Sequence, residues 1–404
     1  MSTAAPHQRP VDLTGSLARR LRHAPAGPLL ARREAAVLFL PDRGDPATVE
    51  LHRGAFVPRR GRPALAPTSI VRGPARVLAD IIEGSDSGVR AFLDHEVTVR
   101  GDLSLAMALD GLFEPGETPD QWPHAGMVTA AGVDTAYLDA GPRAARPIVL
   151  LHGLGATNAS LLPILWDLAA DHRVIAPDLP GFGASDAPSI SYAPASFVPW
   201  ALDLCRQLNL ERPVLVGNSM GGRIALEIAL EKPDVAAGVI GLCASPAFRR
   251  MRQLVPFVRL LRPEVAWLPL RVPRRVVLNG ARAMFSRPDR LPDAWYDAAA
   301  DEFLRVFAIP DHRVALFAAT RQIYLDEAFG LRGFWDLLPS LAPPALFIWG
   351  ERDRLVSPKF AHHVSDCLPA ATSVVLDDCG HVPQFERPEQ TAAICRQFLA
   401  DLPA

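Results

Sequence analysis

The chain has 404 residues, of which 49% are hydrophobic and 21% charged, a composition that suits globular domains with sizeable cores and excludes wholesale disorder. Its formal net charge of -2 offers no global field to recruit nucleic acid. The five cysteines are scattered without metal-ligand spacing and no signal segment opens the chain, which predicts a reduced, cytoplasmic protein.

The first third of the chain predicts a small α+β domain. Residues 1–10 are expected to be a disordered tail and residues 11–113 to form the domain, because helical and strand-like runs mix there without regular βαβ order. The predicted helices are 13–21, 75–82 and 103–109, and the predicted strands are 35–40, 48–51, 69–72 and 96–100. The segment 114–126, rich in Pro, Gly and acids, is predicted to be a linker.

From residue 127 the pattern changes to apolar runs of strand length that alternate with helical segments. After a hairpin over 128–139, these runs are 148–151, 174–176, 214–216, 239–242, 346–349 and 373–376. Continuous apolar strands separated by helices predict a mostly parallel sheet covered on both faces. The alternation stops at 246–340, an arginine-rich stretch that predicts a helical cap.

The segment Gly217-Asn218-Ser219-Met220-Gly221 has the Gly-x-Ser-x-Gly pattern of a nucleophile elbow. The pattern alone is weak evidence, since a Gly-rich turn has the same letters. Here an apolar strand precedes it and a helical run follows, which is the setting that such an elbow requires. Glycines permit a sharp turn and leave the serine exposed above the sheet. Ser219 is therefore the candidate nucleophile.

A serine hydroxyl needs a base, and the base needs an orienting acid. His381 follows the last predicted strand, and Asp353 follows the strand before it. Both lie at carboxyl ends of strands, as Ser219 does, where functional groups gather in a parallel sheet. Glu351 is the main rival for the acid role, with the pair 377–378 less favoured because of its closeness to His381.

Backbone N–H groups are also needed to bind an oxyanion. The segment His152-Gly153-Leu154-Gly155 follows the strand at 148–151 and opens the next helix. The N–H groups of Leu154 and Met220 are the predicted donors, and His152 is expected to brace the loop rather than react. No metal or organic cofactor is predicted.

With these motifs, residues 127–404 resemble the α/β-hydrolase family. The segments 176–185 (APDLPGFGAS) and 380–389 (GHVPQFERPE) are also similar to its usual motifs. The resemblance implies a mostly parallel, eight-stranded α/β-hydrolase sheet with a helical cap at about 246–340. The segment 217–222 is similar to the subgroup that cleaves carbon–carbon bonds, but that subgroup commonly has Trp after its histidine, where this chain has Val382. Serine in place of Asp disfavours epoxide hydrolase and dehalogenase activity.

Residues 11–113 resemble sterol carrier protein type 2 domains, in which a five-stranded sheet and helices surround a lipid tunnel. The resemblance is carried by 84–109, with an apolar helix face that includes Leu105 and Leu109. The resemblance implies a lipid in this domain; the alternative is that the face fills a small core. The cap mixes apolar and arginine residues, which is typical of an ordinary solvated cap, with peripheral membrane contact as the alternative.

The sequence thus predicts a serine hydrolase that cleaves a small hydrophobic carboxylic ester through an acyl-enzyme. The catalytic residues are Ser219, His381 and Asp353. One alternative is carbon–carbon bond hydrolysis by the same triad. A second alternative is a non-catalytic lipid-binding or scaffold protein. No nucleic-acid partner is expected.

Overall fold

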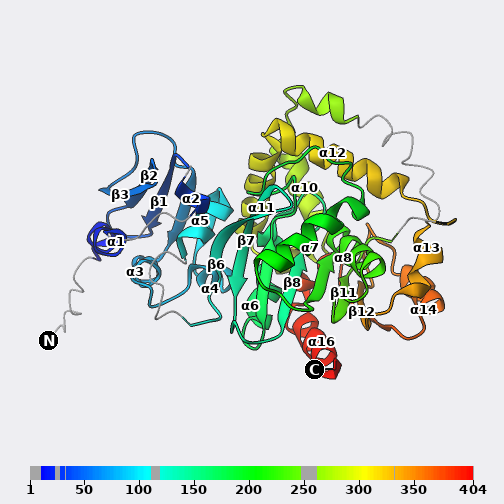
Figure 1. Cartoon of the computed structure of the whole chain (residues 1–404). Coiled ribbons are helices and arrows are strands. Elements are labelled where there is room, and N and C mark those ends of the chain that lie inside the picture. Colours follow the sequence, from blue (N-terminus) through cyan, green and yellow to red (C-terminus); the bar gives the residue numbers. More distant parts are fainter. Residues whose placement is uncertain are drawn as a thin grey trace. The chain divides into compact units, whose positions relative to one another are not determined.

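The computed structural model describes residues 11–22, 28–31, 33–110, 119–246, 262–331 and 333–403. They form two compact units, 1–118 and 119–404, each with its own sheet (Figure 1). The predicted tail 1–10 and the cap segment 247–261 lie outside the described residues. Among the described residues no helix is long and apolar enough to cross a membrane.

The N-terminal unit contains a five-stranded sheet in the order β3-β2-β1-β4-β5. Its strands are β1 (Ala35–Pro41), β2 (Ala47–His52), β3 (Ala55–Arg60), β4 (Ser69–Gly73) and β5 (Thr98–Gly101). Its helices are α1 (Leu13–Leu21), α2 (Pro28–Ala31), α3 (Ala75–Glu83), α4 (Gly88–Leu93) and α5 (Leu103–Asp110). Strands β1 and β4 are parallel, and the remaining neighbours are antiparallel.

Local sequence explains the first helix and the strand that the sequence pattern missed. The Asp12 side chain accepts a hydrogen bond from the Gly15 N–H and so caps α1. Residues Leu13, Leu17 and Leu21 recur at one-turn spacing and are all buried. Strand β3 is an edge strand with a mostly exposed side-chain pattern, so it lacks the apolar run by which the other strands are recognised. An edge also tolerates Pro58, which has no N–H to donate.

The C-terminal unit is built on an eight-stranded sheet in the order β13-β12-β11-β10-β8-β9-β7-β6. The strands are β6 (His124–Ala130), β7 (Val133–Ala140), β8 (Pro147–Leu151), β9 (Arg173–Pro177), β10 (Val214–Asn218), β11 (Gly238–Leu242), β12 (Ala345–Gly350) and β13 (Thr372–Leu376). Only β7 runs antiparallel to its neighbours β6 and β9; the other pairs are parallel. The predicted mostly parallel sheet of eight strands is confirmed.

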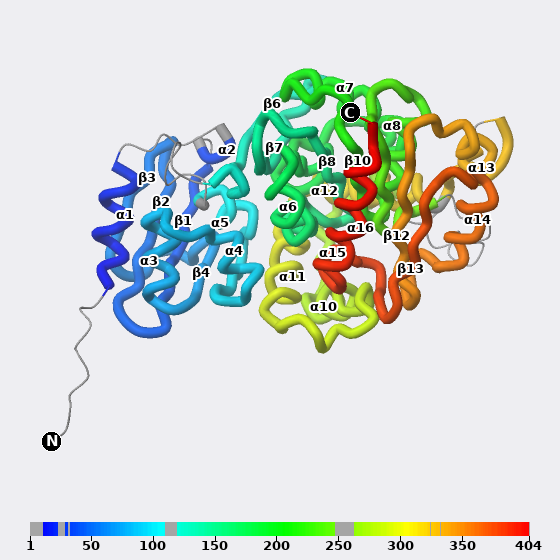
Figure 2. Tube along the Cα trace, turned by 90° about the horizontal axis from the view of Figure 1, so that it is seen from below, coloured from blue at the N-terminus to red at the C-terminus, as the bar shows by residue number. Residues whose placement is uncertain are grey.

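Helices cover both faces of this sheet. They are α6 (Leu162–Leu168), α7 (Val198–Gln207), α8 (Met220–Glu231), α14 (Phe360–Cys367), α15 (Pro383–Glu386) and α16 (Pro388–Asp401), with the short 3-10 helices η1 (Asn158–Leu161) and η2 (Pro194–Phe197). The connection from β8 to β9 through α6 runs toward the β6 edge of the sheet. The connections through α7, α8 and α14, which lead to β10, β11 and β13, run toward the β13 edge. Because parallel crossovers are right-handed, α6 lies on one face and the other three lie opposite. Helix α16 packs beside α6 (Figure 2).

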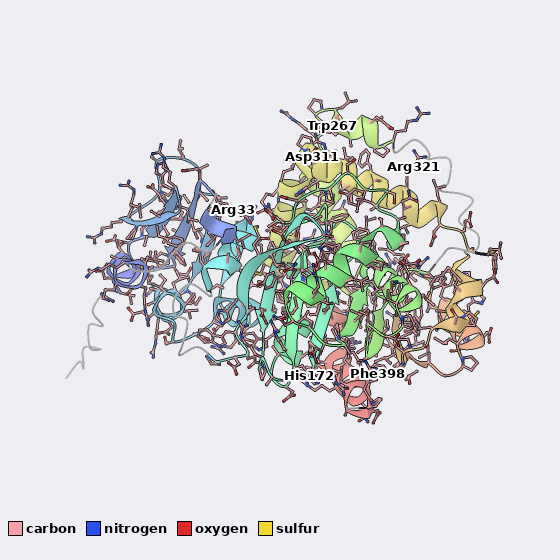
Figure 3. The ribbon with its side chains drawn as sticks, viewed as in Figure 1. Arg33, His172, Trp267, Asp311, Arg321 and Phe398 are labelled. Atoms are coloured by element: carbon pink, nitrogen blue, oxygen red, sulfur yellow. The ribbon has the colours of Figure 1, made fainter. Side chains whose placement is uncertain are left out.

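The described part of the cap is helical. It comprises η3 (Pro263–Trp267), α10 (Arg274–Ala283), η4 (Pro288–Arg290), α11 (Asp293–Phe307), α12 (Pro310–Leu325), α13 (Phe334–Leu337) and η5 (Leu338–Ser340). The buried Arg313 on α12 donates to the carbonyls of Ala266 and Leu268 and so holds η3 in place. Trp267 is 61% exposed at the outer surface of the cap (Figure 3). Peripheral membrane contact through this cap stays a prediction.

Candidate active site

Ser219 occupies a strained turn between β10 and α8. Its φ of 53° lies in the left-handed region that non-glycine residues rarely adopt, and strain of this kind clusters at functional sites. The flanking glycines are required sterically. A Cβ at Gly221 would lie 2.1 Å from the Leu151 carbonyl oxygen, and one at Gly217 would lie 2.3 Å from the Gly221 carbonyl oxygen. The serine side chain itself remains partly exposed.

The structure brings His381 and Asp353 together at the carboxyl ends of β13 and β12. His381 Nδ1 and Asp353 Oδ2 are 2.7 Å apart, and both side chains are almost completely buried. The other carboxylate oxygen, Oδ1, accepts from the N–H groups of Leu355 and Val356 at 2.8 and 2.9 Å. Asp353 is therefore fixed by its own loop and in turn fixes the imidazole.

The rival acids have other partners. Glu351 is half exposed and accepts from the N–H of Asp378, at 3.0 Å. The Asp378 carboxylate accepts from Ser286 Oγ and pairs with Arg352 and Arg290. Neither carboxylate contacts the ring of His381 in the described part of the chain. The geometry therefore favours Asp353 as the orienting acid.

Asn218, the residue before the serine, joins the histidine segment to the nucleophile turn. Its Nδ2 donates to the Leu242 carbonyl at 2.9 Å and to the His381 carbonyl at 3.1 Å. The Ser219 N–H also donates to the Leu242 carbonyl, at 3.0 Å. No hydrogen bond joins Ser219 Oγ to His381 among the described residues. Such catalytic bonds often tighten only when substrate binds.

The two predicted oxyanion donors belong to segments that meet at the serine turn. Met220 is the first residue of α8, so its N–H has no partner within the helix. Gly153 lies against the serine: a Cβ built on it would be 3.4 Å from Ser219 Cβ. Leu154 follows directly, and its N–H stays the predicted second donor.

His152 braces this loop through both ring nitrogens. Its Nε2 accepts from the Leu179 N–H at 3.0 Å, so Nδ1 carries the proton and donates to the Gly153 carbonyl at 2.9 Å. That carbonyl and the Leu154 N–H belong to one planar peptide unit. Anchoring the carbonyl therefore sets the direction of the predicted oxyanion donor.

The pH dependence of stability should reveal this neutral histidine. Burial lowers the pKa of His152 from 6.5 to about 4. Between these values the unfolded chain binds more protons than the folded one, so stability is lost as the pH falls from about 6.5 to about 4. The loss from this one group is at most about 3 kcal/mol. We expect His152→Gln, which does not titrate, to flatten this part of the curve in denaturant unfolding.

The matched control is His362→Gln, because His362 is exposed on α14. This variant should keep the wild-type dependence of unfolding free energy on pH. An identical slope for wild type and His152→Gln would contradict the assignment of His152 as the titrating group.

Apolar side chains from the cap cover the oxyanion loop, a feature that the sequence pattern did not locate. A Cβ at Gly155 would lie 3.3 Å from Phe303 Cε2 on α11 and 3.4 Å from Leu316 Cδ1 on α12. Leu154 and Leu316 also pack against the main core of the unit. A reacting group at Ser219 would thus meet hydrocarbon next to the backbone donors.

One group in the described part of the chain has atoms close enough to hold a metal ion: Cys243, Asp353 and His381, whose ligand atoms lie within 4.8 Å of one another. Two of these residues already bond to each other. Burial is the main cause that raises the pKa of the Cys243 thiol well above its usual value, and the nearby Asp353 raises it further. The thiol therefore stays protonated. Asp353 and His381 are therefore engaged with each other, and Cys243 offers a neutral thiol rather than the thiolate that binds a metal.

A family model described as "Alpha/beta hydrolase family" matches residues 148–394, more than half of the chain. The chain belongs to the alpha/beta hydrolase family. The match includes all of the predicted catalytic and oxyanion residues, and the fold agrees with it.

Curated relatives of this hydrolase are similar over most of their own length. The magnesium-chelatase 30 kDa subunit of Rhodobacter capsulatus is 29% identical over 67% of this chain and 93% of its own. The 2-hydroxymuconate semialdehyde hydrolase of Pseudomonas sp. (strain CF600) is 29% identical over 71% of this chain and 98% of its own. The pimeloyl-[acyl-carrier protein] methyl ester esterase of Aeromonas hydrophila is 27% identical over 62% and 94%. The relatives thus include a semialdehyde hydrolase and a methyl ester esterase.

Proposed function

We propose that the C-terminal unit hydrolyses carboxylic esters with a hydrophobic acyl group through an acyl-enzyme on Ser219. The observation that carries the proposal is the buried bond of 2.7 Å between His381 Nδ1 and Asp353 Oδ2, linked through Asn218 to the serine turn. The apolar contacts of the oxyanion loop with Phe303 and Leu316 support an acyl chain over an ionic group. The esterase among the relatives is consistent with this chemistry.

In the proposed reaction, Ser219 Oγ attacks the ester carbonyl while His381 Nε2 takes the hydroxyl proton. Asp353 holds the imidazole and stabilises its charged form. The N–H groups of Leu154 and Met220 bind the developing oxyanion, usually the largest electrostatic contribution. His381 then protonates the departing alcohol, and water releases the acid by the same steps in reverse.

The test is a panel of nitrophenyl esters of increasing acyl length, together with fluorophosphonate labelling. The proposal expects labelling and a rise in kcat/KM with chain length. Each buried methylene contributes about 0.8 kcal/mol, so the rise is about threefold to fourfold per methylene until the site is full. No labelling and no turnover of any ester would overturn the proposal and favour the non-catalytic alternative.

Carbon–carbon bond hydrolysis is the second candidate, and the semialdehyde hydrolase relative favours it. It uses the same triad. The residue after the histidine, Val382, speaks against it because the subgroup commonly has Trp there. Turnover of a coloured dienone without turnover of nitrophenyl esters would favour this candidate.

For the N-terminal unit we propose binding of the apolar ester before hydrolysis. The five-stranded sheet with its helices supports the resemblance to sterol carrier domains. The helix residues Leu105 and Leu109 are fully packed, and an open surface pocket of about 350 Å³ in this unit is lined by residues that include Asp42, Arg72 and Glu96. The proposal therefore expects this helix face to move apart when lipid enters.

Deletion of residues 1–113 should separate delivery from stability. If the unit supplies the ester at high effective concentration, kcat/KM for long-chain esters should fall about tenfold or more while that for short esters stays near wild type. The measurement is the same ester panel with both proteins. An equal loss for long and short esters would indicate a purely stabilising role, and no loss would rule out delivery.

A further inference from the structure

Glu386, at the end of α15, is a buried carboxylate that accepts hydrogen bonds only from backbone N–H groups among the described residues. Its Oε2 accepts from Gly380 at 2.7 Å and from Ser286 at 3.0 Å, and its Oε1 accepts from Arg287 at 2.8 Å. Only 7% of the residue is exposed. Three charge-assisted bonds to fixed backbone groups make this side chain a rigid bridge.

The bridge joins two segments that lie almost a hundred residues apart. One is the histidine loop, residues 377–382, between β13 and α15. The other is the cap strap, residues 284–290, which runs from the end of α10 through η4. Gly380 belongs to the first segment, and Ser286 and Arg287 belong to the second. Glu386 thus holds the residue before the proposed catalytic base against the cap.

Other contacts show how closely the two segments fit. The His381 N–H donates to the Met284 carbonyl at 2.7 Å. A Cβ at Gly380 would lie 2.3 Å from that carbonyl oxygen, so no larger residue fits there without a shift. The Ser286 hydroxyl donates to Asp378 Oδ1 at 2.9 Å, and Arg290 pairs with the same carboxylate. The cap strap therefore holds the backbone that leads into His381.

We propose that Glu386 is a positioning residue that couples the seating of the cap to the alignment of His381. The inference rests on the proposed function of His381 as general base. Glu386 does not act on substrate. It fixes the peptide that leads into His381, while Asp353 fixes the ring, so the base is aligned only when the strap is docked.

The chemistry of the three bonds makes Glu386→Gln a sharp test. Both carboxylate oxygens accept, so the amide of Gln must point its NH₂ at one or two N–H donors whichever way it turns. The side-chain volume is unchanged. Misplacement of a base by about 1 Å costs on the order of 100-fold in rate, so we expect kcat to fall about 10- to 100-fold. KM should change much less, since the base acts in the transition state.

The matched control is Glu389→Gln, three residues along the chain, because Glu389 is exposed on α16. Amide hydrogen exchange provides a readout that does not depend on turnover. Glu386→Gln should speed exchange in both the histidine loop and the cap strap, whereas the control should leave both unchanged. Should Glu386→Gln fold poorly, Glu386→Asp keeps the charge but is too short to reach all three donors, and it should show the same changes more weakly.

Faster exchange in both segments together with the loss in kcat supports the proposal. Exchange unchanged in either segment would overturn the coupling. Faster exchange with wild-type kcat would overturn the positioning role. If wild type hydrolyses no ester, the proposed function fails on its own, the exchange arm still decides the coupling, and the rate of fluorophosphonate labelling replaces kcat.

Discussion

Ser219→Ala is expected to abolish fluorophosphonate labelling and to reduce ester turnover by about 10⁶-fold, because the members of a triad act as a unit. The residual rate would come from the oxyanion donors and substrate binding alone. The fold should persist, since alanine retains the backbone strain at φ 53° and the lost hydroxyl is only partly buried. Mass spectrometry of labelled peptides and thermal unfolding measure the two effects.

Ser160→Ala is the control for this variant. In the described part of the chain the Ser160 hydroxyl donates only to the Thr157 carbonyl nearby, so labelling and turnover should match wild type. Labelling that persists in Ser219→Ala would identify another nucleophile. Cys379 lies within the histidine loop, but burial raises the pKa of its thiol to about 12, which leaves it neutral and unreactive.

The C-terminal sheet was readable from sequence because its central strands are buried on both faces. Strands β8, β10 and β11 appear as unbroken apolar runs for this reason. Strand β3 of the N-terminal unit was not predicted, because an exposed edge strand lacks such an apolar run. Burial on both faces therefore makes the central strands the clearest in the sequence, although β13, which is only partly buried, is also predicted from its apolar residues.

The candidate site also contains residues that the sequence predicts and contacts that it does not. Residues at strand ends follow from chain order, and so the sequence alone predicts Ser219, Asp353 and His381. The sequence does not predict the contacts of Asn218, Glu386 and Met284. They join segments distant in sequence through a single side chain or carbonyl, and such contacts leave no period or motif in the chain. Only the folded backbone shows that the cap reaches the histidine loop.

Asp353→Asn tests the acid assignment against its rival. Asparagine can still accept from Leu355 and Val356 through its remaining oxygen, so the loop should keep its shape. Its NH₂ group then faces His381 Nδ1 and forces the proton onto Nε2, the tautomer that cannot take a proton from Ser219. We expect kcat to fall about 10⁴-fold with little change in KM.

Glu351→Gln is the matched comparison, because Glu351 is the main alternative acid and, in the described part of the chain, it accepts from the Asp378 N–H and pairs with Arg352. Its kcat should fall less than about tenfold, since a half-exposed side chain that does not touch the imidazole contributes no more than one ordinary hydrogen bond. Steady-state kinetics of both variants on one nitrophenyl ester decide the matter. A larger loss in Glu351→Gln than in Asp353→Asn would transfer the acid role to Glu351, and the buried bond between Asp353 and His381 would then be a structural contact of the histidine loop.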